Sequence, residues 1–117
     1  MDDFAVKSGQ PNTYGLVQGE RNRIEPGKRM LSSMTPTIVA KEGRLRAVLG
    51  TPGGSTITTT VVQLIRNLID YQMPLDEAVR AARIHHQWQP DQIVLESKLP
   101  QSVNDGLGAM GHKVVIS

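Results

Sequence analysis

The sequence predicts an α+β fold, and three observations indicate it. Two β-rich runs surround a short turn in the middle of the chain, two helical patterns follow, and a strand, a helix and a strand close the chain. The predicted order of elements is therefore ββααβαβ. With 117 residues the chain is long enough for one ordinary domain with a core and too short for two. We expect residues 1–117 to form a single partial domain.

The β-rich runs are residues 37–40 and 45–49, and Gly43 stands third in the turn between them. This arrangement predicts an antiparallel hairpin. Before it, residues 8–27 are rich in Gly, Pro, Asn, Gln and Arg and have few apolar side chains, which is typical of a long exposed loop. Loops of this length in a compact domain are usually lids, binding segments or linkers.

The first helix is predicted from apolar residues at helical spacing, namely Ile57, Val61, Leu64, Ile65 and Leu68. Ser55 or Thr56 is the expected cap, and the helix is expected to end near Tyr71. Pro74 at a first helical position, followed by two acidic residues, predicts a second helix that ends near Arg83.

The last third of the sequence predicts a short strand over residues 93–95, a helix over residues 100–110 and a final strand over residues 113–116. Gly111 is the expected stop of that helix, because glycine readily adopts the left-handed conformation that ends helices.

Composition excludes several function classes. There are 13 basic and 11 acidic residues, scattered through the chain, and only one Phe, two Tyr and one Trp, so we expect no nucleic-acid binding. The absence of cysteine excludes disulfides and thiolate chemistry. No apolar stretch reaches the length that spans a bilayer, so we expect no membrane insertion. No cofactor is expected either.

The most informative feature is the stretch from Thr51 to Ser55, which joins the second β-run to the first helix. Gly53 and Gly54 lack a Cβ, so consecutive backbone N–H groups there are able to converge on one anion, and the helix dipole behind them favours negative charge. Such a nest suits a developing oxyanion. Taken alone, the same residues also fit an ordinary strand-to-helix turn.

Five motifs follow one another in an order that resembles γ-glutamyltranspeptidases. They are Met1-Asp2-Asp3-Phe4, Pro26-Gly27-Lys28-Arg29, Leu31-Ser32-Ser33-Met34-Thr35-Pro36-Thr37, Gly50-Thr51-Pro52-Gly53-Gly54-Ser55 and Arg83-Ile84-His85-His86-Gln87-Trp88. The resemblance runs from Met1 to about Val115. It implies part of an N-terminal nucleophile hydrolase with an αββα sandwich, made as a precursor that cuts itself into a large and a small subunit.

The resemblance also implies the roles of individual residues. Asp3 matches the carboxylate that holds the donor's α-ammonium group, and Ser32 and Ser33 match the hydroxyls that bind its α-carboxylate. Gly53 and Gly54 match the amides of the oxyanion hole.

The loop over residues 8–19 matches a lid over the glutamyl pocket, with Tyr14 as an aromatic wall residue. The family's nucleophilic Thr lies upstream of the Met-Asp-Asp-Phe motif, so this chain alone is expected to be inactive. The implied partners are a γ-glutamyl donor such as glutathione and the large subunit of the same precursor. The implied location is the periplasm or the medium.

Three other interpretations remain open. The first is a related N-terminal nucleophile acylase that acts on cephalosporin side chains or poly-γ-glutamate. The second is a non-catalytic module that binds an anion at Gly53 and Gly54. The third is a piece that self-associates through the apolar helix near residues 57–68. His85 and His86 suggest a metal site, but adjacent histidines point apart and no third ligand is nearby, so we expect no metal.

Overall fold

The computed structural model describes residues 4–116 of the chain. Its internal contacts form two units, residues 1–58 and residues 59–117, and each unit is described by itself. The single partial domain therefore stays a prediction. Asp3, the expected partner of the donor's ammonium group, lies outside the described residues.

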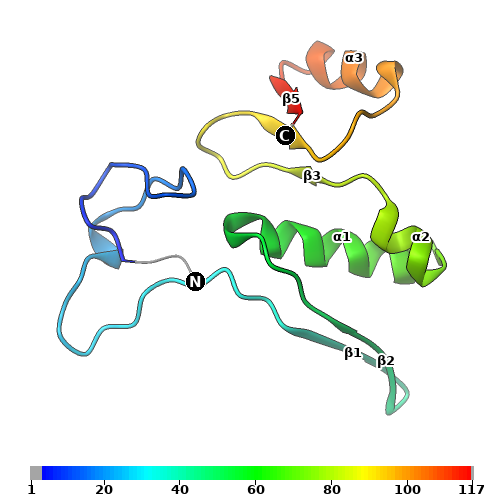
Figure 1. Cartoon of the computed structure of the whole chain (residues 1–117), viewed down its shortest axis with the longest axis horizontal. Helices are drawn as coiled ribbons and strands as arrows, with labels where there is room; N and C mark the ends of the chain where they lie inside the picture. The colour runs from blue at the N-terminus through cyan, green and yellow to red at the C-terminus, as the bar shows by residue number, and fades with distance from the viewer. Residues whose placement is uncertain (1–3, 117) are drawn as a thin grey trace. The chain divides into compact units, whose positions relative to one another are not determined.

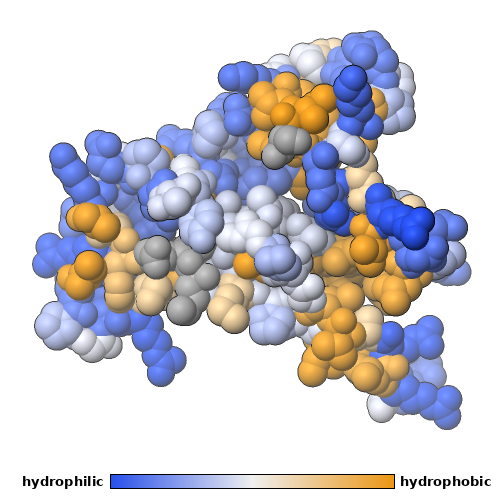
Figure 2. Space-filling view, viewed as in Figure 1, coloured by the Kyte–Doolittle hydropathy of each residue, from blue (hydrophilic) through white to orange (hydrophobic). Residues whose placement is uncertain are grey.

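The first unit contains the predicted hairpin (Figure 1). Strands β1 (Thr37–Lys41) and β2 (Arg44–Leu49) pair antiparallel. Glu42 and Gly43 have φ angles of 52° and 73°, the left-handed geometry that a two-residue hairpin turn requires. Ile38 and Val48 face each other across the strands and are 72% and 67% exposed. Apolar surface accordingly gathers over the hairpin in Figure 2.

The predicted loop over residues 8–27 is folded back on itself. The Gly9 amide donates to the Gln18 carbonyl at 2.9 Å, and the Asn12 amide donates to the Leu16 carbonyl at 3.0 Å. A 3-10 turn (Glu20–Asn22) then leads out of it. These contacts give the segment a defined shape without a regular strand or a long helix.

Helix α1 (Ile57–Ile69) begins in the first unit and continues in the second. Ile57, Val61 and Leu64 are buried, as the helical spacing predicted. The expectation that Ser55 or Thr56 caps this helix is wrong. A 3-10 turn (Gly54–Thr56) precedes α1 with Gly53 at its N-cap, and the Thr56 hydroxyl donates to the Gly53 carbonyl at 3.0 Å.

Helix α2 (Leu75–Arg80) ends three residues before the predicted boundary at Arg83. The reason is that Ala81 is already extended, with φ −56° and ψ 137°, and the chain enters a short strand, β3 (Ile84–His85). This strand was not predicted. Pro74 was predicted at the first helical position, but it is the N-cap of α2, and the helix begins one residue later at Leu75.

The second unit ends in a mixed sheet of order β3-β4-β5. β4 (Ile93–Leu95) pairs antiparallel with β3 and parallel with β5 (Val114–Ile116), and α3 (Gln101–Ala109) connects β4 to β5 (Figure 1). Leu95 is fully buried in this unit. Gly111 has φ 89° just after α3, in agreement with its predicted role as a helix stop.

The α+β class is confirmed by these elements. Within residues 4–116, no helix combines the length and the apolar character needed to cross a bilayer.

Candidate active site

The turn between β2 and α1 contains two consecutive glycines with positive φ angles. Gly53 has φ 142° and ψ 7°, and Gly54 has φ 58°, so both lie outside the conformations that other residues readily adopt. Among residues 4–116, neither the Gly53 amide nor the Gly54 amide donates a hydrogen bond. Two adjacent backbone donors at the start of a helix are therefore available for an anion.

Space as well as backbone conformation requires glycine at both positions. A Cβ on Gly53 would collide with the Thr56 hydroxyl oxygen. A Cβ on Gly54 would lie 2.5 Å from Cε1 and 2.7 Å from Cδ1 of the Tyr14 ring. The Tyr14 ring thus lies directly against the glycine turn, which brings together two residues that are forty positions apart in the sequence.

Ser33 is joined to the same turn. Its hydroxyl donates to the Gly54 carbonyl at 2.7 Å, and its own carbonyl accepts from the Thr58 hydroxyl at 3.5 Å. Thr35 and Thr58 also contact each other, with 3.3 Å between their hydroxyl oxygens. These contacts hold the serine segment beside the first turn of α1.

The hydroxyl groups of Ser32 and Ser33 differ in their hydrogen bonds. Ser32 is exposed, and its hydroxyl oxygen accepts from the Met34 amide at 3.2 Å, which leaves the hydroxyl hydrogen for a ligand. Ser33 directs its hydroxyl hydrogen to the Gly54 carbonyl. Binding of a carboxylate by both serines stays a prediction, and it requires the Ser33 hydroxyl to turn away from Gly54.

Tyr14 is positioned by Asn12, a residue that the sequence analysis missed. The Asn12 side-chain oxygen accepts from the Tyr14 amide at 2.9 Å and from the Leu16 amide at 3.0 Å. An Asn two residues before a Gly-containing turn is the signal that could have indicated it. The lid role of residues 8–19 stays a prediction, but the contact of Tyr14 with Gly54 is an observed feature.

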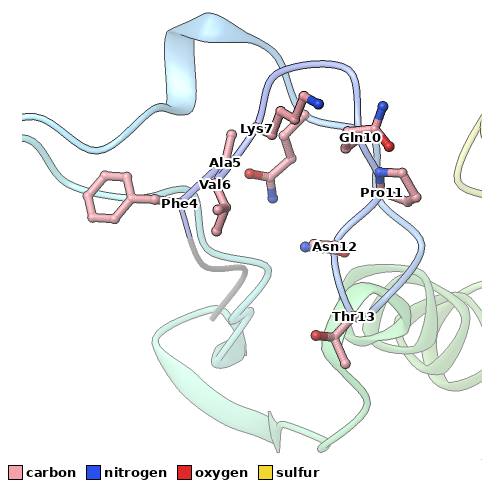
Figure 3. Close-up of a pocket in the computed structure, with 9 residues that line it drawn as sticks. Phe4, Ala5, Val6, Lys7, Gln10, Pro11, Asn12 and Thr13 are labelled. Carbon is pink, nitrogen blue, oxygen red and sulfur yellow. The ribbon is translucent and has the colours of Figure 1, made fainter.

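A cavity of about 430 Å³ lies in the first unit (Figure 3). Its lining residues are Phe4, Ala5, Val6, Lys7, Gln10, Pro11, Asn12, Thr13 and Gln18. The Phe4 ring points away from Lys7, Gln10 and Asn12 in the close-up. Neither the serine pair nor the glycine pair lines this cavity, so it is distinct from the turn described above.

Shifted pKa values in the first unit belong to a surface ion-pair cluster. The pKa of Glu25 is lowered, first by a hydrogen bond from the Arg23 guanidinium at 2.7 Å and then by the charge of Lys28. The pKa of Arg23 is raised, chiefly by that same hydrogen bond. Stability from the lowered Glu25 pKa is present above its unfolded pKa and is lost as the pH falls. These groups are exposed, so their contribution is small.

The histidines of the Arg83–Trp88 motif have hydrogen-bond partners in the second unit. His85 Nδ1 lies 2.9 Å from the Thr59 hydroxyl, and His86 Nε2 lies 3.1 Å from an Asp91 carboxylate oxygen. Trp88 is 70% exposed. Within the described part of the chain, no three His, Cys, Asp or Glu side chains gather as metal ligands would.

Comparison with known proteins gives a consistent result. The family model for γ-glutamyltranspeptidase matches residues 1–117. The glutathione hydrolase proenzyme of Escherichia coli is 50% identical over 116 residues, which are 99% of this chain and 20% of that protein. An acylase ACY 1 proenzyme from a Pseudomonas species is 46% identical over 100 residues, which are 85% of this chain and 17% of that protein.

A crystal structure of a Helicobacter pylori γ-glutamyltranspeptidase mutant superposes with a TM-score of 0.94 at 52% identity. The match covers 100% of this chain and 63% of that one. The fold is thus that of the N-terminal nucleophile hydrolases, as the resemblance implied. Within this class, the chain belongs to the γ-glutamyltranspeptidase family. It spans about a fifth of the length of the E. coli relative.

Proposed function

We propose that the protein carrying this chain cleaves the γ-glutamyl amide of glutathione-like donors and transfers the glutamyl group to water, amino acids or peptides. The observation that carries the proposal is the pair of unengaged amides at Gly53 and Gly54, with the Ser33 segment bonded to the same turn. Membership of the family supports it.

The turn would act on the oxygen of the scissile carbonyl. A threonine hydroxyl from outside residues 1–117 attacks the γ-carbonyl carbon, and its proton passes to the threonine's own α-amino group. The carbonyl oxygen becomes an oxyanion that accepts hydrogen bonds from the Gly53 and Gly54 amides. Collapse of this intermediate expels the amine, which takes up the proton. Water or an acceptor amine then cleaves the acyl-enzyme ester.

Other residues would hold the head group of the donor. Asp3 pairs with the α-ammonium group, and Ser32 with Ser33 binds the α-carboxylate, while Tyr14 closes one side of the glutamyl pocket. The partners are the donor and the large subunit of the same precursor, and the protein is exported to the periplasm or the medium. Without the nucleophile, the 117-residue chain by itself is inactive.

The test uses the full-length protein and γ-glutamyl p-nitroanilide. We expect release of p-nitroaniline that disappears, together with self-cleavage, when the threonine at the new N-terminus is replaced by alanine. Retention of both by that variant would contradict the proposal. A protein that binds small anions but releases no p-nitroaniline would instead be the non-catalytic anion-binding module.

The acylase alternative is favoured by one observation, the 46% identity to an acylase proenzyme. The two proposals differ in the head group of the donor that the enzyme should prefer. A γ-glutamyltranspeptidase should prefer γ-glutamyl p-nitroanilide over glutaryl p-nitroanilide, which lacks the ammonium group that Asp3 would bind. Faster turnover of the glutaryl substrate would establish the acylase.

A further inference from the structure

We propose that Asn22 is a positioning residue for the head group of the γ-glutamyl donor. It holds in place the segment that carries Ser32 and Ser33, the residues that would bind the donor's α-carboxylate. This inference rests on the proposed function, because it concerns the same donor pocket.

Asn22 is buried, and three of its hydrogen bonds join it to residues far from one another in the sequence. Only 5% of it is exposed, and its partner Gln18 is 8% exposed. The Asn22 carbonyl accepts from the Ala5 amide at 2.9 Å, and its side-chain oxygen accepts from the Leu31 amide at 3.1 Å. Its side-chain Nδ2 donates to the Gln18 side-chain oxygen at 2.5 Å. Buried polar groups that are fully paired in this way specify one local arrangement.

Two of these partners lie close in the sequence to residues that would bind the donor. Ala5 follows Asp3 by two residues, and Leu31 directly precedes Ser32. The α-ammonium and α-carboxylate groups of a glutamyl donor are attached to one carbon atom, so the groups that bind them must keep a fixed separation. The Asn22 side chain holds the Leu31 amide and thereby fixes the place of Ser32 and Ser33, the groups that would bind the carboxylate.

The carboxamide is suited to this task because it offers one acceptor and one donor. Asn22→Asp keeps the acceptor for the Leu31 amide, and the Gln18 amide is able to rotate so that it donates to the new carboxylate. Asn22→Ala removes the link to Leu31 and leaves Gln18 without this donor. Asn22→Thr keeps a polar side chain that is too short to reach the Leu31 amide.

The experiment compares these variants in the full-length protein on three p-nitroanilides. The γ-glutamyl substrate has the whole head group, the glutaryl substrate lacks the ammonium group, and the 4-aminobutyryl substrate lacks the α-carboxylate. Asn67→Ala is the control, because Asn67 is a partly buried asparagine of α1 that bonds the Ala78 carbonyl at 3.3 Å in the other unit.

We expect Asn22→Ala and Asn22→Thr to raise KM for the γ-glutamyl substrate about tenfold, the effect of one lost buried hydrogen bond, with kcat within about twofold. Their kcat/KM for the 4-aminobutyryl substrate should change by less than about twofold, because that substrate has no carboxylate for the displaced serines to bind. Asn22→Asp and Asn67→Ala should keep the wild-type KM.

Two results would overturn the inference. One is a wild-type KM in both Asn22→Ala and Asn22→Thr. The other is an equal loss of kcat/KM on all three substrates, which would mean that Asn22 only stabilises the fold. If the wild-type protein releases no p-nitroaniline from the γ-glutamyl substrate, the proposed function itself fails, and that outcome is distinguishable from both of these.

Discussion

At the scale of single residues, the contact between Gly54 and Tyr14 restricts position 54 to glycine. The Gly54 backbone is left-handed, with φ 58°, and a Cβ there would lie 2.5 Å from the Tyr14 ring. A side chain at this position would therefore be both strained and obstructed. Gly9 is also left-handed, with φ 75°, but a Cβ there would meet nothing within 4 Å.

These two glycines form a matched pair for mutation. We expect Gly54→Ala to destabilise the full-length protein by about 2–3 kcal/mol, the sum of backbone strain and steric displacement of Tyr14. Gly9→Ala should cost only about 1 kcal/mol, from strain alone. Urea unfolding midpoints at unchanged m-value measure both effects.

The double variant separates the two causes. In a Tyr14→Ala background, Gly54→Ala should cost no more than Gly9→Ala, because the obstructing ring is gone. An unchanged cost in that background would show that the Tyr14 ring does not limit the side chain at position 54.

The two serines should respond differently to replacement. Ser33→Ala removes the hydrogen bond to the Gly54 carbonyl and should destabilise the protein by about 1 kcal/mol. It should also lower kcat, because the turn that we propose binds the oxyanion loses this contact. Ser32→Ala is its control and should raise KM for the γ-glutamyl substrate with little change in stability, since the exposed Ser32 hydroxyl is free to bind a ligand. Unfolding midpoints and steady-state kinetics on the two variants test this, and identical profiles would contradict it.

The structural roles of some residues could be predicted from the sequence, and those of others could not. The backbone conformations of Gly53 and Gly54 were predictable, because glycine readily adopts positive φ angles and this requirement is local. Asn12 and Asn22 were not predicted. The Asn22 side chain bonds the Leu31 amide, nine residues away, and its carbonyl bonds the Ala5 amide, so its role depends on how the loop folds.

At the scale of elements, the Gln63 side chain of α1 forms a clasp with β3, the edge strand that pairs with β4. The Gln63 side-chain oxygen accepts from the Ile84 amide at 2.9 Å, and its Nε2 donates to the Ile84 carbonyl and to the Thr59 carbonyl, both at 2.8 Å. The side chain thus pairs with the free edge of β3 as a neighbouring strand would. A pattern search over residues 84–85 could not find this strand, because it has only two residues and both its partner strand β4 and the Gln63 side chain lie elsewhere in the sequence.

Loss of the Gln63 hydrogen bonds should change the hydrogen-exchange rate of the Ile84 amide. We expect Gln63→Leu to make the Ile84 amide exchange with solvent about tenfold faster, because its acceptor is removed. Gln63→Glu keeps an acceptor and should preserve most of the protection above the pKa of the glutamate. Amide hydrogen exchange measures both variants, and unchanged exchange at Ile84 in Gln63→Leu would contradict the clasp.

At the scale of the whole molecule, the hairpin has an exposed apolar face. Ile38 and Val48 face each other and are mostly exposed, and Leu45 is 65% exposed. The sequence analysis had placed the exposed apolar surface on the first helix. Ile57, Val61 and Leu64 of that helix are buried, whereas Val62 is 51% exposed.

Self-association of the isolated 117-residue chain is the expected result. Its sedimentation coefficient should increase with concentration, and replacing Ile38 and Val48 together with lysine should shift it toward the monomer value. Replacing Val6, which is 93% exposed but lies outside the hairpin, with lysine is the control and should have no such effect. A monomer of the unmodified chain at all concentrations would contradict this expectation.

The central claim is that the Gly53 and Gly54 amides bind the oxygen that becomes negatively charged during acyl transfer. The most direct measurement is a crystal structure of the full-length protein with a γ-glutamyl analogue that imitates the tetrahedral intermediate. The account predicts one analogue oxygen within about 3 Å of both amide nitrogens. An analogue held at the nucleophile with that oxygen bound elsewhere, and with both amides donating to the protein, would contradict it.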